Sequence, residues 1–351
     1  MTRTNRLKYT SVEICAGAGG QAVGLHNAGF KHAALIEIDR DACQTLRTNI
    51  ARHSEWDGCR VIEADLKNFD SEELGLESGT LDLLAGGVPC PPFSAAGKQL
   101  GADDERDLFP TMLRLVDELE PKAVMIENVR GLLDPKFAEY RKDIVNRLES
   151  MGYEVCYWDL LEAKNYGVPQ LRPRAILVAM KPEYAKHFQH SKPEEREIVS
   201  VGQALHDSMR ARYDAVASDP RAELAFKRWY EKALEGVAPT VVGGSKKHGG
   251  ADLGPTRAKR AWAELGVCAL GVANEPHEMK DSERDLFAPA GPKLTVTQAA
   301  LIQGFPEDWK FYGRKTAAYR QVGNAFPPPV AQAVGEQIYA ALEAAAEVQQ
   351  S

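Results

Sequence analysis

Short apolar runs alternate with amphipathic stretches from Ser11 to Met180, and this rhythm constrains the fold more than any other feature of the chain. The stretches between the runs carry apolar residues at helical spacing, as Ala42, Leu46 and Ile50 do. Strands that alternate with helices form βαβ units of a parallel sheet. The sequence therefore predicts a doubly wound α/β domain with strands at VEICA (12–16), AALIEI (33–38), RVIEA (60–64), LDLLAGG (81–87), KAVMIE (122–127) and AILVAM (175–180).

The alternation stops near Lys181. Residues 183–291 are richer in Pro, Gly, His and charged residues, and their weak periodicity indicates a second, looser domain. Regular spacing returns after Pro292, and the last helix is expected to present one apolar face that carries Val330, Val334, Ile338 and Leu342.

Composition and cysteine spacing narrow the class of protein. The chain is 44% hydrophobic and 26% charged, as soluble globular proteins are, and its net charge of −7 argues, taken alone, against a chain coated with nucleic acid. We expect a soluble, cytoplasmic protein, because no run approaches the roughly 20 apolar residues of a membrane span. The six cysteines form no Cys-x-x-Cys pair and have no histidine at metal spacing, so we expect no metal site and no disulfide framework.

A glycine turn follows the first predicted strand. Gly17, Gly19 and Ala22 match the G-x-G-x-x-G/A spacing, which lets backbone amides approach a ligand at a helix N-terminus. The second strand ends near Glu37 and the third near Asp65, where carboxylates can accept hydrogen bonds from a ribose and an adenine amine. These residues predict an adenosine-containing cofactor. NAD and S-adenosylmethionine both fit, and a tight turn with helix-capping acids is the simpler alternative.

Three kinds of functional side chain, a thiol, a carboxylate and two guanidinium groups, follow later strands. Cys90 stands among three prolines after the fourth strand, and Glu127 ends the fifth. After a further helix and strand, Arg172 and Arg174 stand two residues apart, on one side of an extended segment. A buried thiol, a capping carboxylate and two surface arginines are the simpler readings. Because open α/β sheets bind ligands beyond the carboxyl ends of their strands, we expect an active site instead.

These motifs resemble the cytosine-5 DNA methyltransferase family. EICAGAGG, PCPPFS, ENV, QLRPR and RQVGNAFPPPV are similar to its cofactor loop, nucleophile loop, acid motif, arginine motif and C-terminal motif, in the same order. The resemblance spans residues 11–180 and 292–337. It implies a Rossmann-like catalytic domain, residues 1–182 and 292–351, which is discontinuous because a target-recognition domain, residues 183–291, is inserted in it. The last helix must then pack back on the first domain.

The resemblance also implies a mechanism. Cys90 would attack carbon 6 of a cytosine that is flipped out of double-stranded DNA, and carbon 5 would then accept a methyl group to give 5-methylcytosine. Glu127 would hold ring nitrogen 3 and the exocyclic amine, and Arg174 the O2 edge, while Arg172 would support the loop.

The cofactor implied by the resemblance is S-adenosylmethionine. The sequence departs from the family pattern in two motifs. Glu13 and Cys15 stand where the family usually has Asp and an aromatic residue, and Phe326 with the triple proline replaces smaller apolar residues in the C-terminal motif. The positions expected to contact the cofactor are Gly17, Ala18, Gly19, Gly20, Glu37, Ile38, Asp65, Leu66, Pro89, Asn324 and Ala325.

The inserted region carries a local positive charge. Residues 183–291 contain 16 Lys plus Arg against 17 Asp plus Glu, but residues 241–262 contain five basic residues and one acidic one. Basic side chains flanked by glycines suit a DNA backbone, although a solvated loop has the same composition. The residues expected to bind DNA are Lys246, Lys247, Arg257 and Lys259, with Arg260 beside them.

Three other functions remain open at this point. A tRNA substrate fits the same chemistry, and an NAD-dependent oxidoreductase explains the glycine turn but gives no role to PCPPFS, ENV or QLRPR. A non-catalytic DNA-binding module leaves the thiol unexplained. We expect a monomeric bacterial enzyme associated with the nucleoid. It is either a stand-alone methyltransferase or the modification half of a restriction-modification system, whose endonuclease acts on the same site.

Overall fold

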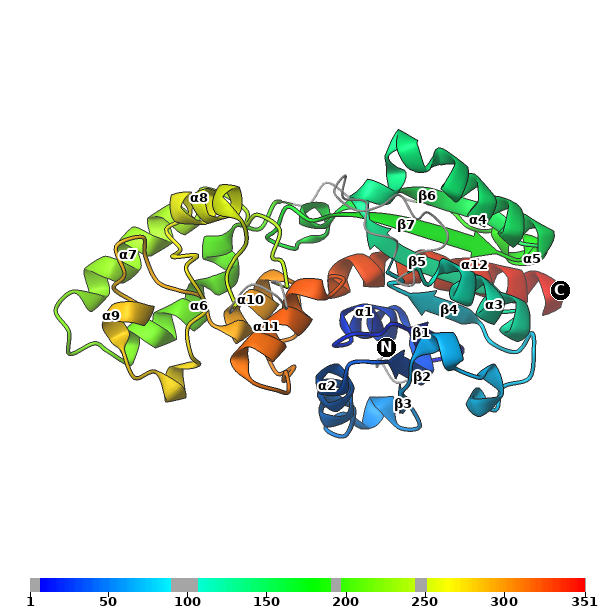
Figure 1. Cartoon of the computed structure of the whole chain (residues 1–351), viewed down its shortest axis with the longest axis horizontal. Coiled ribbons are helices and arrows are strands. Elements are labelled where there is room, and N and C mark those ends of the chain that lie inside the picture. The colour runs from blue at the N-terminus through cyan, green and yellow to red at the C-terminus, as the bar shows by residue number, and fades with distance from the viewer. Residues whose placement is uncertain (1–6, 90–106, 191–196, 244–250, 351) are drawn as a thin grey trace. The chain divides into compact units, whose positions relative to one another are not determined.

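The computed structural model of the chain describes residues 7–89, 107–190, 197–243 and 251–350 (Figure 1). The chain divides into two compact units. Unit 1 comprises Met1–Leu161, Pro173–Lys192 and Val330–Ser351, and unit 2 comprises Glu162–Arg172 and Pro193–Pro329. In the described part of the chain, no helix is both long and apolar enough to cross a membrane.

Unit 1 is built around a seven-stranded sheet with the strand order β3-β2-β1-β4-β5-β7-β6. β1 to β5 pair in parallel, whereas β7 pairs with β5 in the antiparallel direction. The predicted α/β class is confirmed, and each of the six predicted runs overlaps a strand, but the expectation of a wholly parallel sheet is wrong for the run at 175–180, which lies in the antiparallel β7. The strands are β1 (Tyr9–Ile14), β2 (Phe30–Glu37), β3 (Arg60–Glu63), β4 (Leu83–Gly86), β5 (Ala123–Val129), β6 (Glu154–Glu162) and β7 (Pro173–Met180).

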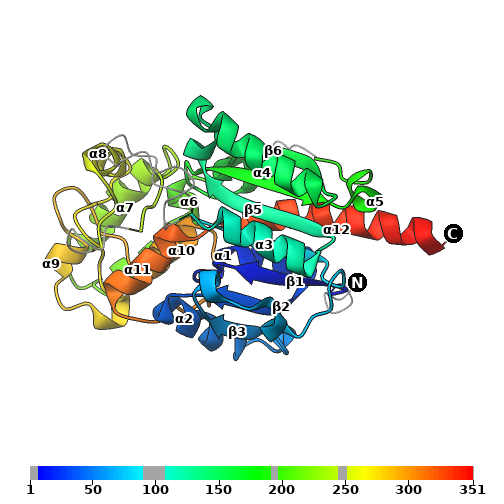
Figure 2. The ribbon, with the colours of Figure 1, turned by 45° about the vertical axis from the view of Figure 1, so that its right-hand side comes forward.

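Helices cover both faces of this sheet (Figure 2). Val12 and Ile14 of β1 belong to a buried core that also contains residues of α3 and α4. Tyr9 of β1 points to the opposite face, because side chains alternate along a strand, and its ring packs against Tyr339 of α12 with centroids 5.0 Å apart. The helices of this unit are α1 (Gly20–Ala28), α2 (Arg40–Ile50), α3 (Phe109–Leu119), α4 (Ala138–Ser150), α5 (Pro182–Ala185) and, from Val330 onward, α12 (Pro328–Gln350).

The C-terminal helix α12 returns to the beginning of the chain. A Cβ atom on Gly335 would lie 2.8 Å from Leu25 Cδ2 of α1, so glycine permits a close approach of the two helices. The Tyr9 hydroxyl also donates a hydrogen bond to Glu343 at 2.6 Å. The predicted apolar face and the packing of the last helix on the first domain are therefore confirmed, and the face consists of the buried residues Val330, Val334, Ile338 and Leu342.

The strand order creates a switch point beside β1. The chain runs from β1 outward through β2 to β3 and then crosses to β4, on the other side of β1. The loops that leave the carboxyl ends of β1 and β4 therefore diverge, and such a crevice is where open α/β sheets bind ligands. The glycine turn follows β1, and the segment that leads to Cys90 follows β4.

Unit 2 is helical and has a core of its own. Tyr213 and Trp262 are fully buried, and Trp229 is 2% exposed. The expectation of a looser domain with weak periodicity is wrong for α6, which buries Val201 and Leu205 in a four-residue spacing that continues to Tyr213. Its helices are α6 (Val201–Asp214), α7 (Ala222–Ala233), α8 (Thr256–Glu264), α9 (Ser282–Asp285), α10 (Val296–Ile302) and α11 (Lys315–Asn324).

The division by contacts differs from the boundary expected from the sequence. Residues 292–329 and Glu162–Arg172 belong to unit 2, together with the segment expected to recognise the target. Thr295 begins α10 with a capping box to Gln298, and Arg212 of α6 donates to the Gln298 side chain at 2.8 Å. These contacts explain why the chain after Pro292 packs with α6.

Candidate active site

The turn after β1 contains three residues with left-handed backbone conformations. Cys15, Gly17 and Gly19 have φ angles of 51°, 54° and 87°. Glycine adopts this region without steric cost. The Gly17 amide donates a hydrogen bond to Glu37 Oε2 at 2.7 Å, so the carboxylate at the end of β2 holds the turn in place.

The two acids at the end of β2 have structural partners. The second oxygen of Glu37 accepts hydrogen bonds from the amides of Ile38 and Asp39 at 2.9 and 2.8 Å. Asp39 caps α2 by accepting from the amides of Asp41 and Ala42. Asp39 is thus a helix cap, whereas Glu37 holds the amides of the glycine turn and of the two residues that follow it.

The other positions expected to contact a cofactor differ in exposure. Ala18, Gly19 and Gly20 are buried where α1 begins, and Gly19, the N-cap residue, supplies no side chain to cap the helix. After the end of β2, Ile38 is 63% exposed, and after the end of β3, Asp65 is also exposed.

Leu66 belongs to the core of unit 1, with 4% of its surface exposed, so its side chain is committed to packing. Pro89 is exposed at the end of β4. Asn324 and Ala325 lie in unit 2, where the Asn324 side chain is exposed and Ala325 is buried.

The first departure from the family pattern, Glu13, is a buried acid. Glu13 lies in β1 with none of its surface exposed, and neither carboxyl oxygen has a hydrogen-bond partner among the described residues. Burial raises its pKa well above the usual value of 4.5, so the side chain is held as a neutral acid.

Glu13→Gln is expected to make stability less dependent on pH. The folded protein keeps a proton on Glu13 that the unfolded chain releases above a pKa of 4.5, so folding stability falls as pH rises above that value. The slope approaches about 1.4 kcal/mol per pH unit until the folded pKa is reached. Urea denaturation at pH 5, 6.5 and 8 gives the free energy of unfolding. The difference between variant and wild type should move in favour of the variant as pH rises, and a difference that does not change with pH would contradict a proton held on Glu13.

The end of β4 lies close to β1 and to Glu127. A Cβ atom on Gly86 would lie 2.4 Å from Ile14 Cγ1 and 2.5 Å from the Ile14 carbonyl oxygen, so only glycine fits there. A Cβ atom on Gly87 would lie 3.0 Å from Glu127 Oε2. The Glu127 carboxylate therefore lies over the backbone that leads to Cys90. The sequence pattern does not single out Gly87.

Two hydrogen bonds fix the chain on either side of the thiol loop. The Asn128 side-chain amide donates to the Val88 carbonyl at 2.8 Å, and the Leu108 amide donates to the Pro89 carbonyl at 3.2 Å. Cys90 lies outside the described residues. Its neighbour Pro89 is thus held between β5 and the start of α3.

Glu127 and Arg174 form an ion pair at the carboxyl edge of β5. Arg174 Nε lies 2.6 Å from Glu127 Oε1, and the two side chains are 13% and 14% exposed. The antiparallel register pairs Val129 with Arg174 and Glu127 with Ile176, which makes Glu127 and Arg174 diagonal neighbours on one face. The structure therefore brings these two predicted residues together, and the pair can hydrogen-bond a planar polar group from both its acceptor and its donor side.

Arg172 has different partners from Arg174. It lies in unit 2, is 1% exposed, and donates to the carbonyls of Val241, Gly323 and Ala325 at 2.7, 2.9 and 2.8 Å. These three acceptors are backbone carbonyls, and Arg172 also donates to the Gln170 side chain at 3.4 Å. Two buried residues that the sequence pattern does not single out, Gln170 and Gln303, hydrogen-bond each other beside it at 2.7 Å.

Most described cysteines are poor nucleophiles. Burial raises the pKa of Cys15, Cys43 and Cys59 to about 12 and that of Cys156 to about 11. Thiols with such pKa values are almost entirely protonated at neutral pH, and the thiolate is the reactive form. These four residues therefore do not compete with Cys90 for the role of nucleophile.

The described part of the basic segment lies on and before α8. Arg257 and Arg260 are exposed, and Lys259 is paired with Asp252 at 2.9 Å. Asp252 is the single acidic residue of the segment, so its charge is already balanced by Lys259. Lys246 and Lys247 lie outside the described residues.

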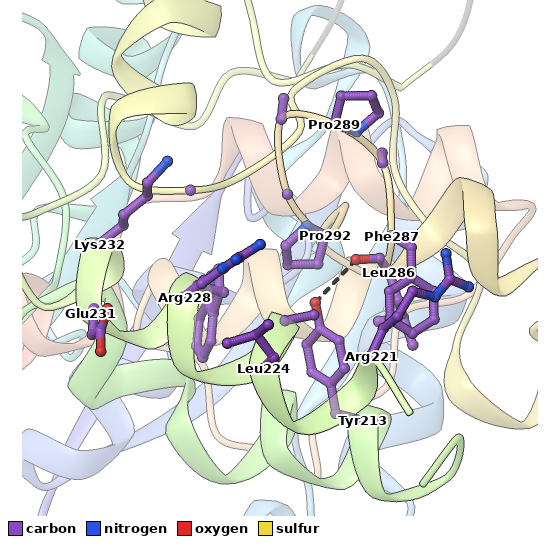
Figure 3. A pocket seen from close by; sticks show the side chains of 16 residues that line it. Tyr213, Arg221, Leu224, Arg228, Glu231, Lys232, Leu286, Phe287, Pro289 and Pro292 are labelled. Atoms are coloured by element: carbon purple, nitrogen blue, oxygen red, sulfur yellow. Dashed lines mark hydrogen bonds between the residues drawn. The ribbon is translucent and has the colours of Figure 1, made fainter. Parts of the chain in front are cut away.

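A cavity of about 520 Å³ lies in unit 2, between α7 and the loop from Leu286 to Pro292 (Figure 3). The Tyr213 hydroxyl donates to the Leu286 carbonyl at 3.0 Å beside it. The lining of the cavity includes none of the residues that the sequence predicts to be catalytic, cofactor-binding or DNA-binding. We therefore do not assign the active site to this cavity.

Comparisons with known proteins agree with the motifs. The sequence model of the family described as "C-5 cytosine-specific DNA methylase" matches residues 9–340. The Type II methyltransferase M.NaeI of Lentzea aerocolonigenes is 52% identical over 332 residues, which cover 94% of this chain and 75% of that protein. The Type II methyltransferase M.NgoMIV of Neisseria gonorrhoeae is 49% identical over 341 residues, which cover 96% and 99%.

Among solved structures, one described as a DNA modification methyltransferase encoded within an Escherichia coli prophage superposes with a TM-score of 0.62. It covers 96% of this chain and 100% of that one at 21% sequence identity. At this identity the likeness shows the fold alone.

Proposed function

The chain belongs to the family of C-5 cytosine-specific DNA methylases and is a DNA methyltransferase of that family, and from this premise we propose how its site works. We propose that it methylates carbon 5 of a cytosine flipped out of double-stranded DNA, through a covalent adduct between Cys90 and carbon 6. The observation that carries the proposal is the Glu127–Arg174 pair, which lies over the backbone that leads to Cys90.

The residues after β1 and β2 fit S-adenosylmethionine. The uncapped first turn of α1 suits the carboxylate end of that molecule, and Ile38 beside Glu37 offers an apolar surface next to a hydrogen-bond acceptor, as an adenosine requires. Asp65 and Asn324 complete the proposed set. When bound, S-adenosylmethionine supplies an electrophilic methyl group on a sulfonium.

The chain's own residues then account for the reactivity of the base. The Cys90 thiolate adds to carbon 6, which makes carbon 5 nucleophilic, and Glu127 stabilises the enamine by holding the proton at nitrogen 3. Arg174 donates to O2 of the cytosine, and its ion pair with Glu127 keeps that carboxylate in position. Carbon 5 would take the methyl group, which leaves the sulfonium as a neutral thioether, and would then lose its proton to water. The electron pair of the broken C–H bond would expel the thiolate from carbon 6.

The substrate and setting follow the same family premise. We propose that residues 183–291 recognise the DNA sequence, with the exposed basic face of α8 near the phosphates. The name Type II methyltransferase, carried by both relatives above, supports a role as the modification enzyme of a restriction-modification system. In this proposal the protein acts as a cytoplasmic monomer, and an endonuclease of the same specificity is its partner.

Methyl transfer from labelled S-adenosylmethionine tests the proposal. Duplex DNA and tRNA are supplied separately as acceptors, and the modified base is identified after hydrolysis. We expect label in 5-methylcytosine of the duplex DNA. Label in tRNA alone, or at another atom of the base, would contradict the proposed substrate.

A further inference from the structure

Three buried polar side chains form a cluster in unit 2 that the proposed mechanism does not use. Gln170 and Gln303 are 0% exposed and Arg172 is 1% exposed. We propose that Arg172, with Gln170 and Gln303, is a positioning residue that fixes the Gly323–Ala325 turn against Val241–Gly243 and thereby sets the affinity for cofactor. The inference rests on the proposed function, in which Asn324 contacts S-adenosylmethionine.

Arg172 hydrogen-bonds the backbone on both sides of Asn324. One guanidinium nitrogen donates to the carbonyls of Gly323 and Ala325, and the other donates to Val241 at 2.7 Å. Asn324 itself is exposed, whereas Gly323 and Ala325 are buried. The Asn324 side chain is therefore exposed, while the buried guanidinium of Arg172 holds the carbonyls of the residues on either side of it.

The charge of Arg172 suits this location. Helix α11 ends at Asn324, and the last carbonyls of a helix lack partners within the helix and carry its negative dipole end. A guanidinium offers a planar set of donors and keeps its charge when buried, so it satisfies two such carbonyls at once. Lysine at this position would lose the planar set of donors, and burial would lower its pKa.

The two glutamines extend the cluster to the neighbouring segments. Gln303 donates to the carbonyls of Val322 and Ala325 at 2.6 and 3.3 Å, and accepts from Gln170 at 2.7 Å. Gln170 in turn accepts from the Val241 amide at 2.7 Å. A buried polar network of this kind rigidifies the segments that it joins, because any movement leaves buried groups without partners.

The turn and the Val241–Gly243 segment also approach at backbone distance. A Cβ atom on Gly323 would lie 2.4 Å from the Gly243 amide nitrogen. A Cβ atom on Gly243 would lie 2.3 Å from Asn324 Oδ1 and 3.0 Å from the Arg320 carbonyl oxygen. The Asn324 side chain thus lies over Gly243, and a methyl group added there must displace it.

Two variants test the inference in different ways, and both are made in the full chain. Arg172→Lys weakens the grip on Gly323 and Ala325, and Gly243→Ala displaces the Asn324 side chain without removing any polar group. Gly236→Ala is the matched control, because its Cβ atom would meet only Leu265 Cδ2, at 3.8 Å. Calorimetry gives Kd for S-adenosylmethionine, and steady-state kinetics give kcat at saturating cofactor.

We expect Kd to rise about tenfold in Arg172→Lys and Gly243→Ala, with kcat at saturating cofactor within about twofold of wild type. The control should match the wild type in both. A wild-type Kd in folded Gly243→Ala, or a fall in kcat with unchanged Kd in Arg172→Lys, would overturn the inference. The second outcome would place Arg172 at the reacting base.

Amide hydrogen exchange separates this inference from the proposed function. In protein without cofactor, Arg172→Lys should speed exchange in peptides that contain Gly323–Ala325 and leave α4 unchanged. Failure of the wild type to bind S-adenosylmethionine would refute the proposed cofactor alone. Unchanged exchange at the turn would refute the positioning role whatever the cofactor is.

Discussion

Cys90→Ser is expected to abolish methyl transfer, with a fall in turnover of at least about 10³-fold. A serine hydroxyl is almost never ionised at neutral pH, whereas a thiol near a cationic group reaches the thiolate form readily. The variant removes the nucleophile and leaves the glycine turn after β1 intact. Single-turnover transfer of labelled methyl groups to duplex DNA measures the effect, and binding of S-adenosylmethionine should be retained.

Cys156→Ser is the matched control for this change. Cys156 lies in β6 and its pKa is raised to about 11 by burial, so it has no part in the proposed chemistry. Duplex DNA that carries 5-fluorocytosine should trap a denaturant-stable complex with the wild type and the control, because fluorine does not leave as a proton does. Appreciable turnover by Cys90→Ser, or trapping by that variant, would end the nucleophile assignment.

The sheet of unit 1 could be predicted from the sequence because its signal is local. The central parallel strands β1, β4 and β5 are almost entirely buried and therefore read as apolar runs, as LDLLAGG does for β4. The edge of the sheet that holds the candidate functional residues also follows from the sequence, since Glu37 and Glu127 each come at the carboxyl end of a run. The apolar spacing of α6 is also visible in the sequence, at Val201, Leu205 and Tyr213, although the region as a whole was expected to have weak periodicity.

The partners of the two arginines could not be predicted in the same way. Their spacing predicts two side chains on one side of an extended segment. In the structure β7 begins at Pro173, so Arg174 lies in the strand and Arg172 precedes it. Arg174 finds Glu127 because β7 pairs antiparallel with β5, and Arg172 finds carbonyls that lie 69 to 153 residues further along the chain. Backbone carbonyls carry no sequence signal, so a side chain that binds them cannot be matched to its partners by motif.

Glu127→Gln is expected to lower kcat/KM by about 10² to 10³-fold while the protein stays folded. Glutamine has the same shape and can still accept a hydrogen bond from Arg174 Nε, so the contact at 2.6 Å between β5 and β7 is largely preserved. It cannot carry or release the proton at nitrogen 3 that stabilises the enamine. The loss should therefore appear in the chemical step and not in the affinity for S-adenosylmethionine.

The measurement is a single-turnover rate at saturating DNA and cofactor, with Glu139→Gln as control, because Glu139 is an exposed acid on α4. Trapping on 5-fluorocytosine should slow in parallel with methyl transfer, since attack at carbon 6 and charge at nitrogen 3 develop together. A variant that traps at the wild-type rate but transfers slowly would restrict Glu127 to the later step. Full activity would instead reduce the Glu127–Arg174 pair to a structural bridge between two strands, because a carboxylate that can be neutralised without cost takes no part in binding the protonated base.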